Sequence, residues 1–161
     1  MYQMRGIRVS PMPEEEIAVR AINFCHAFGI NDFGKSKRKR KRYDKIFEDL
    51  YLYGITIHVM DDNEWEAHTA NLTIGHCDPS NLTISVPNKI YTMACWGEEH
   101  ALEVMFHELG HLLLAHKPLL HFANKAPTRI EDAEWQADSF AEIVLETMGL
   151  KTNQMSFDFY M

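Results

Sequence analysis

Apolar residues recur at two different intervals along the chain, and these intervals separate helical from extended segments. After Pro13, apolar side chains return every three or four residues as far as Gly29, and three glutamates stand in the first turn, as is typical of a helix. A second stripe with the same interval runs from Tyr43 to Gly54. The pattern therefore predicts two helices in the N-terminal third of the chain.

The interval then shortens to two residues. Residues 55–59 alternate apolar with polar side chains, as expected of a strand with one buried face. The string Asn-Leu-Thr-Ile occurs at both 71–74 and 81–84, and the turn-rich residues between them predict the two arms of a hairpin. Since Pro87 cannot donate to a ladder, the strand at 82–86 is expected to end there or to lie at a sheet edge.

The helical interval returns after Gly97. Residues 128–131, Thr-Arg-Ile-Glu, match a capping box and predict a last helix that begins there and ends at Gly149. Together these elements predict an α+β fold with N-terminal helices, a small, mostly antiparallel three-stranded sheet and two C-terminal helices. We expect residues 1–149 to form one domain and residues 150–161 to form a tail.

The composition favours a protein of the reducing cytoplasm. The 161 residues show neither the roughly 18 consecutive apolar residues of a membrane span nor the apolar core of a secretory signal. The three cysteines lack CxxC spacing, which argues against a disulfide framework.

Charge is distributed unevenly along the chain. Residues 35–42, KSKRKRKR, carry seven of the 16 Lys and Arg residues, which leaves nine basic against 23 acidic residues elsewhere, a net charge of −14. The basic run predicts a solvated arm, with contact to nucleic acid or to an acidic partner as the alternative. The acidic remainder argues against a protein that binds nucleic acid over its whole surface.

The stretch FHELGHLLLAH lies on the helix that follows Gly97 and places two histidines four residues apart. On one helix face, His107 and His111 can converge on a single metal ion. Glu108 projects beside the same point and can reach a water molecule there without being a ligand. Gly110 keeps the helix surface low at this position. A catalytic zinc site needs a third protein ligand, which this helix does not provide.

The last helix offers that third ligand. Glu134, Ala137 and Asp138 share one helix face, so the spacing favours Glu134 as ligand and Asp138 as acceptor of the free ring N–H of His107. Glu131 is the competing ligand, although the capping box already accounts for its carboxylate.

The two motifs together resemble those of a known family. HELGH at 107–111, followed by EWQADSFA at 134–141, looks like the HExxH and ExxA(N/D)xFA pattern of the ImmA/IrrE family of small bacterial and phage-borne metallopeptidases. The order of elements from about Phe47 to Met148 is similar as well. This resemblance implies a gluzincin-like zinc peptidase with Glu134 as third ligand, and a substrate such as a helix-turn-helix repressor of a mobile element.

The sequence hypothesis is therefore a zinc-dependent endopeptidase in which Glu108 is the general base. We expect an extended substrate to add as a strand at the 82–86 edge. Tyr91, His116 and His121 are candidates for stabilising the oxyanion, although histidines beyond a helix end are usually solvated. The alternative is a non-proteolytic, zinc-containing interaction module, such as a toxin or a phage accessory factor.

The tail carries one further pattern. A glutamine followed by spaced apolar residues resembles the short peptides that dock into the cleft of the bacterial replication sliding clamp; the residues are Gln154, Met155, Phe157 and Phe159. An apolar tail that packs on its own domain is the alternative.

Overall fold

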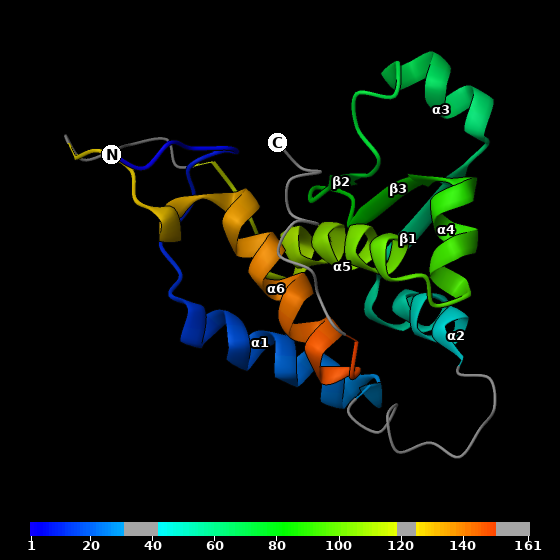
Figure 1. Ribbon diagram of the computed structural model, residues 1–161, viewed down its shortest axis with the longest axis horizontal. Coiled ribbons are helices and arrows are strands. Elements are labelled where there is room, and N and C mark those ends of the chain that lie inside the picture. Colours follow the sequence, from blue (N-terminus) through cyan, green and yellow to red (C-terminus); the bar gives the residue numbers. More distant parts are fainter. Residues whose placement is uncertain (31–41, 119–124, 151–161) are drawn as a thin grey trace.

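A computed structural model shows an α+β fold in which a small sheet and several helices surround one central helix (Figure 1). The structure describes residues 1–30, 42–118 and 125–150. Most of the basic run at 35–42 and the tail beyond residue 150, with its predicted clamp-docking residues, lie outside these ranges. Among the described residues, no helix is both long and apolar enough to cross a bilayer.

Both predicted N-terminal helices are present. Helix α1 (Glu14–Ala27) begins directly after Pro13 and buries the apolar stripe that predicted it, including Ile17 and Phe24. Helix α2 (Tyr43–Glu48) continues into the tighter 3-10 turn η2 (Asp49–Tyr53). Gly54 ends this unit with a φ of 79°, a left-handed conformation that glycine adopts at little cost.

The sheet is mixed rather than mostly antiparallel. Its strands are β1 (Thr56–Met60), β2 (His76–Asp78) and β3 (Thr83–Pro87), in the order β1-β3-β2. β1 pairs with β3 in parallel, and β2 pairs with β3 in antiparallel. The parallel pair arises because a helical crossover separates β1 from the hairpin.

The predicted hairpin forms, but with a different first arm and without a free edge at its second strand. The first arm is β2 and not residues 71–74, because the carbonyl of Thr73 accepts the indole N–H of Trp65 and the preceding Asn71 has a φ of 57°. The second strand does end at Pro87, as expected. It is central, however, with a neighbour on each side, so the substrate edge expected at 82–86 is not available.

Two short helices were not predicted from the sequence. Helix α3 (Asp62–Thr69) follows β1 and is capped by Asp61, whose side chain accepts from the amide of Asn63. Helix α4 (Asn88–Cys95) follows β3 directly and buries only Ile90 and Ala94. Each is only about two turns long, so its apolar stripe is too short to be recognised from spacing.

The two longest helices bring the predicted site together. Helix α5 (Glu99–Leu113) is capped by the Glu98 side chain and packs between α6 (Ala133–Thr147) and the sheet (Figure 1). A Cβ at Gly110 would lie 3.1 Å from the Phe140 ring, so this glycine permits the close approach of the two helices. The predicted capping box forms around the 3-10 turn η3 (Arg129–Glu131), and α6 itself is capped by Asp132.

The N-terminal segment runs alongside the start of α6. The amide of Val9 donates to the carbonyl of Glu131 over 2.8 Å, and the amide of Ala133 donates to the carbonyl of Ile7 over 3.2 Å. The carboxylate of Asp132 accepts from the amides of Arg5 and Gly6 at 2.9 and 3.1 Å. These bonds hold the first residues of the chain against the helix that carries Glu134.

Candidate metal centre

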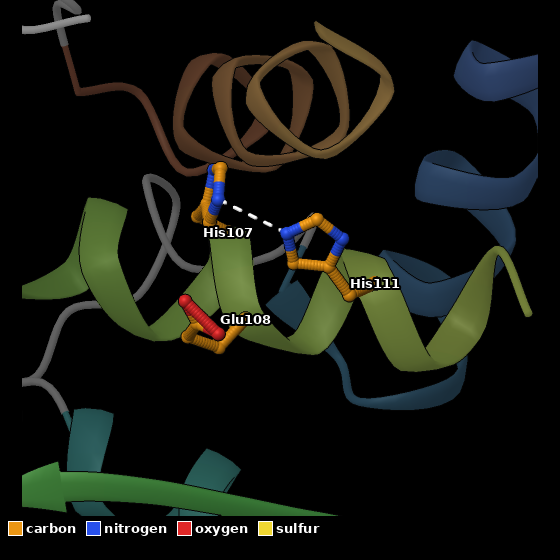
Figure 2. Close-up of side chains that lie close together, drawn as sticks. All are labelled: His107, Glu108 and His111. Carbon is orange, nitrogen blue, oxygen red and sulfur yellow. Dashed lines mark hydrogen bonds between the residues drawn. The ribbon is translucent and has the colours of Figure 1, made fainter. Parts of the chain in front are cut away.

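Two buried histidine rings on α5 face each other, as their spacing predicts (Figure 2). The Nε2 atoms of His107 and His111 are 3.2 Å apart. One ligand atom from each of His107, Glu108 and His111 lies within 4.8 Å of the others, so these three residues form a group that could hold a metal ion.

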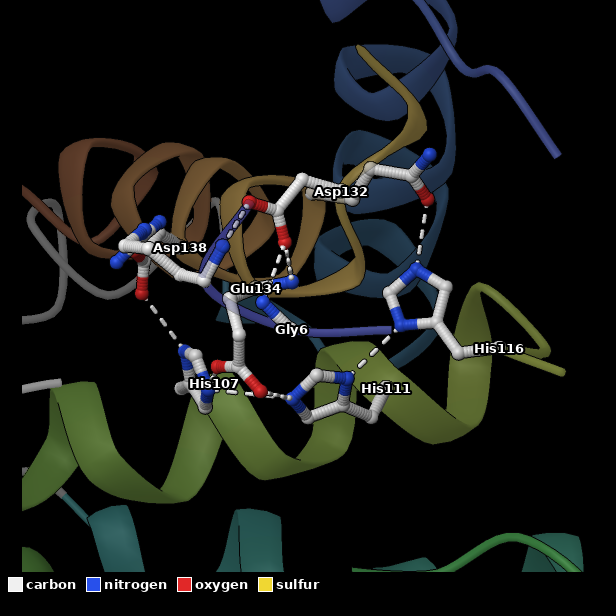
Figure 3. Close-up of polar contacts among 9 residues, drawn as sticks. Gly6, His107, His111, His116, Asp132, Glu134 and Asp138 are labelled. Atoms are coloured by element: carbon white, nitrogen blue, oxygen red, sulfur yellow. Dashed lines mark hydrogen bonds and ion pairs between the residues drawn. The ribbon is translucent and has the colours of Figure 1, made fainter. Parts of the chain in front are cut away.

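Glu134 reaches the same two ring nitrogens from α6 (Figure 3). Its carboxylate oxygens lie 2.8 Å from Nε2 of His107 and 3.4 Å from Nε2 of His111. Ligand atoms bound to a tetrahedral zinc ion at about 2.0–2.1 Å are roughly 3.3 Å from one another. The 3.2 Å between the two ring nitrogens fits this spacing, and the Glu134 carboxylate meets both nitrogens, Oε2 at 2.8 Å from His107 and Oε1 at 3.4 Å from His111.

The competing ligand Glu131 is engaged elsewhere. One of its carboxylate oxygens accepts from the amide and the hydroxyl of Thr128, and the other accepts from Arg8 at 2.8 Å. The arrangement of the carboxylates thus favours Glu134, one turn further along, as the third ligand.

Asp138 lies behind His107, where the sequence analysis placed it. Its Oδ1 is 2.8 Å from Nδ1 of His107, and its Oδ2 accepts from the guanidinium of Arg5 at 2.7 Å. A carboxylate in this position orients the ring and makes its Nε2 a better donor to a metal. Arg5 was not among the predicted site residues. Its local sequence gives no sign of a contact with Asp138, which lies 133 positions further along the chain.

The carboxylates and histidines of this cluster stabilise each other's charged forms. Burial opposes the charged form of His107, but hydrogen bonds to Asp138 and Glu134 outweigh it and raise the pKa of His107 to about 10. Burial acts against the ionised Glu134 as well, yet the two histidines hold the pKa of its carboxyl far below the usual range. An ionised carboxylate and a positively charged partner are therefore the stable combination at neutral pH.

Glu108 projects from α5 beside the histidines (Figure 2) and is buried. A Cβ at Gly75 would lie 3.1 Å from Cγ of Glu108, so the backbone before β2 approaches it closely. Burial raises the pKa of the Glu108 carboxyl, and the charge of Glu134 acts in the same direction. A raised pKa brings a carboxylate nearer to the value at which it exchanges protons efficiently at neutral pH.

Cys77 of β2 adjoins this carboxylate. Burial raises the pKa of its thiol to about 12, and the charges of Glu108 and Glu134 contribute to the shift. The thiol is therefore neutral at physiological pH and forms one wall beside Glu108.

His116 is buried and not solvated, with only 5% of its surface exposed. Its Nδ1 lies 2.8 Å from Nδ1 of His111 (Figure 3). Its Nε2 lies 2.6 Å from Oε1 of Gln136. Burial, followed by the neighbouring charge of His111, lowers the pKa of His116 to about 4. Both ring nitrogens are engaged, so His116 does not serve as an oxyanion donor.

Of the other two oxyanion candidates, the structure places Tyr91 away from the site. The Tyr91 ring packs against Phe47 with centroids 6.2 Å apart, and burial, with Cys95 close by, raises the pKa of Tyr91 to about 12. His121 lies outside the described residues.

No known family model, curated protein or solved structure matches this chain. The structure itself shows a buried His107-Glu108-His111 group on α5 that could hold a metal ion, with Glu134 of α6 against it.

Proposed function

We propose that this protein is a zinc-dependent endopeptidase whose ion is held by His107, His111 and Glu134. One observation carries the proposal: two imidazole nitrogens 3.2 Å apart on α5 are met from α6 by the two oxygens of the Glu134 carboxylate, at 2.8 and 3.4 Å, with the buried carboxylate of Glu108 beside them. Two imidazoles and a carboxylate leave one position of a tetrahedral ion for substrate or water, as a catalytic zinc requires. The likeness of HELGH and EWQADSFA to the ImmA/IrrE pattern supports the same assignment.

The protein residues divide the work of hydrolysis. Zinc, when bound, supplies Lewis acidity to a water nucleophile and to the peptide carbonyl. Glu108 takes a proton from the attacking water as the new C–O bond forms, and gives it to the amine nitrogen as the C–N bond breaks. Asp138 holds the His107 ring in place throughout, and Arg5 in turn holds Asp138.

An extended substrate has one edge of the sheet available next to these groups. β2 is an edge strand that packs against α5, and its Cys77 adjoins Glu108. We propose that a substrate segment adds as a strand to the outer side of β2, which would bring its backbone to the site. A flexible region of a helix-turn-helix repressor is the substrate class that the family resemblance suggests.

The strong burial of the two histidines favours a second candidate. A closed, structural zinc site in an interaction module would also have ligands as buried as His107 and His111. Glu108 distinguishes the two, because a structural site has no need of a buried carboxylate that is not a ligand.

The test is cleavage of candidate helix-turn-helix repressors by the full chain, with and without a zinc chelator, analysed by mass spectrometry. The proposal expects chelator-sensitive fragments from the wild type and none from Glu108→Gln loaded with the same amount of zinc. Intact repressors in a stable complex with both proteins would favour the interaction module. Fragments that persist in the chelator would show that another chemistry cuts them.

A further inference from the structure

A chain of hydrogen bonds leads from His111 to the main chain of two distant segments. Nδ1 of His111 meets Nδ1 of His116 at 2.8 Å, and Nε2 of His116 meets Oε1 of Gln136 at 2.6 Å. The amide nitrogen of Gln136 donates to the carbonyls of Ile130 and Ser10 at 2.7 and 3.0 Å. The three side chains are buried, so water does not compete for these bonds.

The two carbonyls determine which way the Gln136 amide points. An NH₂ group has two hydrogens and can donate to both oxygens at once. A flipped amide would place its own oxygen against two carbonyl oxygens at 2.7 and 3.0 Å, which is repulsive. The oxygen Oε1 therefore faces His116, where it can only accept a hydrogen bond.

An acceptor at that point fixes the hydrogens of two rings in turn. Nε2 of His116 must carry a hydrogen, because it faces Oε1 of Gln136 at 2.6 Å. The two partners of His116 are an imidazole and an amide, neither of them an anion that would hold a second hydrogen on the ring, so its Nδ1 keeps a lone pair. That lone pair accepts the hydrogen on Nδ1 of His111, which leaves Nε2 of His111 free to face His107 and Glu134.

The end of α5 is built to place His116 over His111. The amides of Ala115 and His116 donate to the carbonyls of Leu112 and His111, each over 3.1 Å, and Ala115 has a φ of 53°. This is the Schellman pattern, which brings the residue after the turn back to the one five positions earlier. Left-handed alanine costs about 1 kcal/mol, so its surroundings must hold it in place.

We infer that His116 and Gln136 are positioning residues that set the tautomer of His111 and direct its Nε2 lone pair at the metal. This role rests on the proposed function in one respect, the assignment of His111 as a ligand. The two histidines of the centre are thus held differently. A carboxylate orients His107, and a neutral imidazole fixed by an amide orients His111.

The direct test is nitrogen NMR of the imidazole rings in ¹⁵N-labelled, metal-free wild type at pH 7, because protonated and bare ring nitrogens give well-separated signals. We expect hydrogen on Nε2 and none on Nδ1 of His116, and hydrogen on Nδ1 of His111. The signals are assigned by their loss in His116→Asn and His111→Asn. A His116 ring protonated on Nδ1, or on both nitrogens, would overturn the inference.

Zinc affinity, measured by chelator competition, tests the consequence. Removing the acceptor in His116→Leu is expected to weaken zinc binding about 10- to 100-fold. His116→Asn, whose side-chain oxygen can replace Nδ1 as acceptor, is expected to stay within a few-fold of wild type. The matched control is His68→Leu on the exposed side of α3, which is expected to bind zinc as wild type does.

A double-mutant cycle separates the relay from general damage to the fold. If Gln136 acts on His111 only through His116, Gln136→Leu weakens zinc binding in the wild type but adds nothing to His116→Leu. Additive losses, or wild-type affinity in a folded His116→Leu, would contradict the inference. Failure of the wild type to bind zinc would instead refute the proposed function, and the NMR result on metal-free protein would still decide the tautomers.

Discussion

Replacement of Gly6 by alanine is expected to displace Glu134, the proposed third metal ligand, which lies 128 residues further along the chain. Gly6 lies where the N-terminal segment crosses the start of α6, and its amide donates to Asp132 (Figure 3). A Cβ at this position would be 2.6 Å from Cγ of Glu134. The backbone of Gly6 is not left-handed, so the contact with Glu134 is what excludes a side chain.

The size of the effect follows from that distance. An ordinary carbon contact begins at 3.4 Å, so the two carbons must separate by about 0.8 Å. Neither side yields freely, because Asp132 holds the N-terminal segment and also caps α6 through the amide of Glu134. Overpacking of this kind costs about 1–3 kcal/mol, which corresponds to a roughly 5- to 150-fold loss of zinc affinity if the bound geometry bears the strain.

The assay is chelator competition for zinc, with thermal unfolding measured on the same samples. The control is Gly54→Ala, where an added Cβ meets nothing within 4 Å but the φ of 79° penalises alanine. The control is expected to lose stability and keep its zinc affinity, whereas Gly6→Ala loses zinc affinity. Equal affinities in wild type and Gly6→Ala would refute the argument that Gly6 makes room for Glu134.

Four further predictions concern neighbouring groups. Glu108→Gln is expected to bind zinc as tightly as wild type and to cleave substrate about 10²- to 10⁴-fold more slowly; a wild-type rate would exclude a general base at this position. Arg5→Ala removes the ion pair with Asp138 and is expected to weaken zinc binding, measured by chelator competition, by up to about tenfold; unchanged binding would show that Arg5 does not help to position Asp138. The pKa of His107 is raised to about 10 from 6.5, so its contribution to the stability of metal-free protein is complete below pH 6.5 and is lost as the pH rises through 10. Thermal melts of metal-free wild type are expected to fall across that window more than those of His107→Gln, and parallel curves would contradict this. Ala115→Gly relieves a left-handed alanine and is expected to raise the free energy of unfolding by about 1 kcal/mol in a denaturant titration; a loss of stability would show that Ala115 is unstrained.

The geometry of the centre was predictable where it depended on helical spacing. Histidines four residues apart share a face of α5, and the Glu134-to-Asp138 spacing does the same for α6, so two periodic segments specify most of the polar cluster. The packing of α5 against α6 brings those faces together, and Gly110 permits the close approach that the sequence suggested.

Residues that reach the centre from irregular segments were not predictable. Arg5 and Gly6 contact α6 from a segment with no periodic pattern, and His116 returns to α5 through a turn that has alanine where glycine is usual. A lone histidine beyond a helix end is normally solvated, and only the three-dimensional contact with Gln136 shows otherwise. The first arm of the hairpin was mispredicted for a related reason. The string Asn-Leu-Thr-Ile at 71–74 matches the strand at 81–84 in sequence, but the left-handed backbone at Asn71 makes it a turn, and the strand begins only at His76.

The metal content of the full chain tests the central claim most directly. Protein is loaded with zinc, dialysed against a weak chelator and assayed by elemental analysis, in parallel for wild type and Glu134→Ala. The account predicts about one zinc ion per chain in the wild type and much less in Glu134→Ala, because two imidazoles alone hold the ion weakly. A wild type without zinc, or a Glu134→Ala protein that retains it equally, would contradict the account.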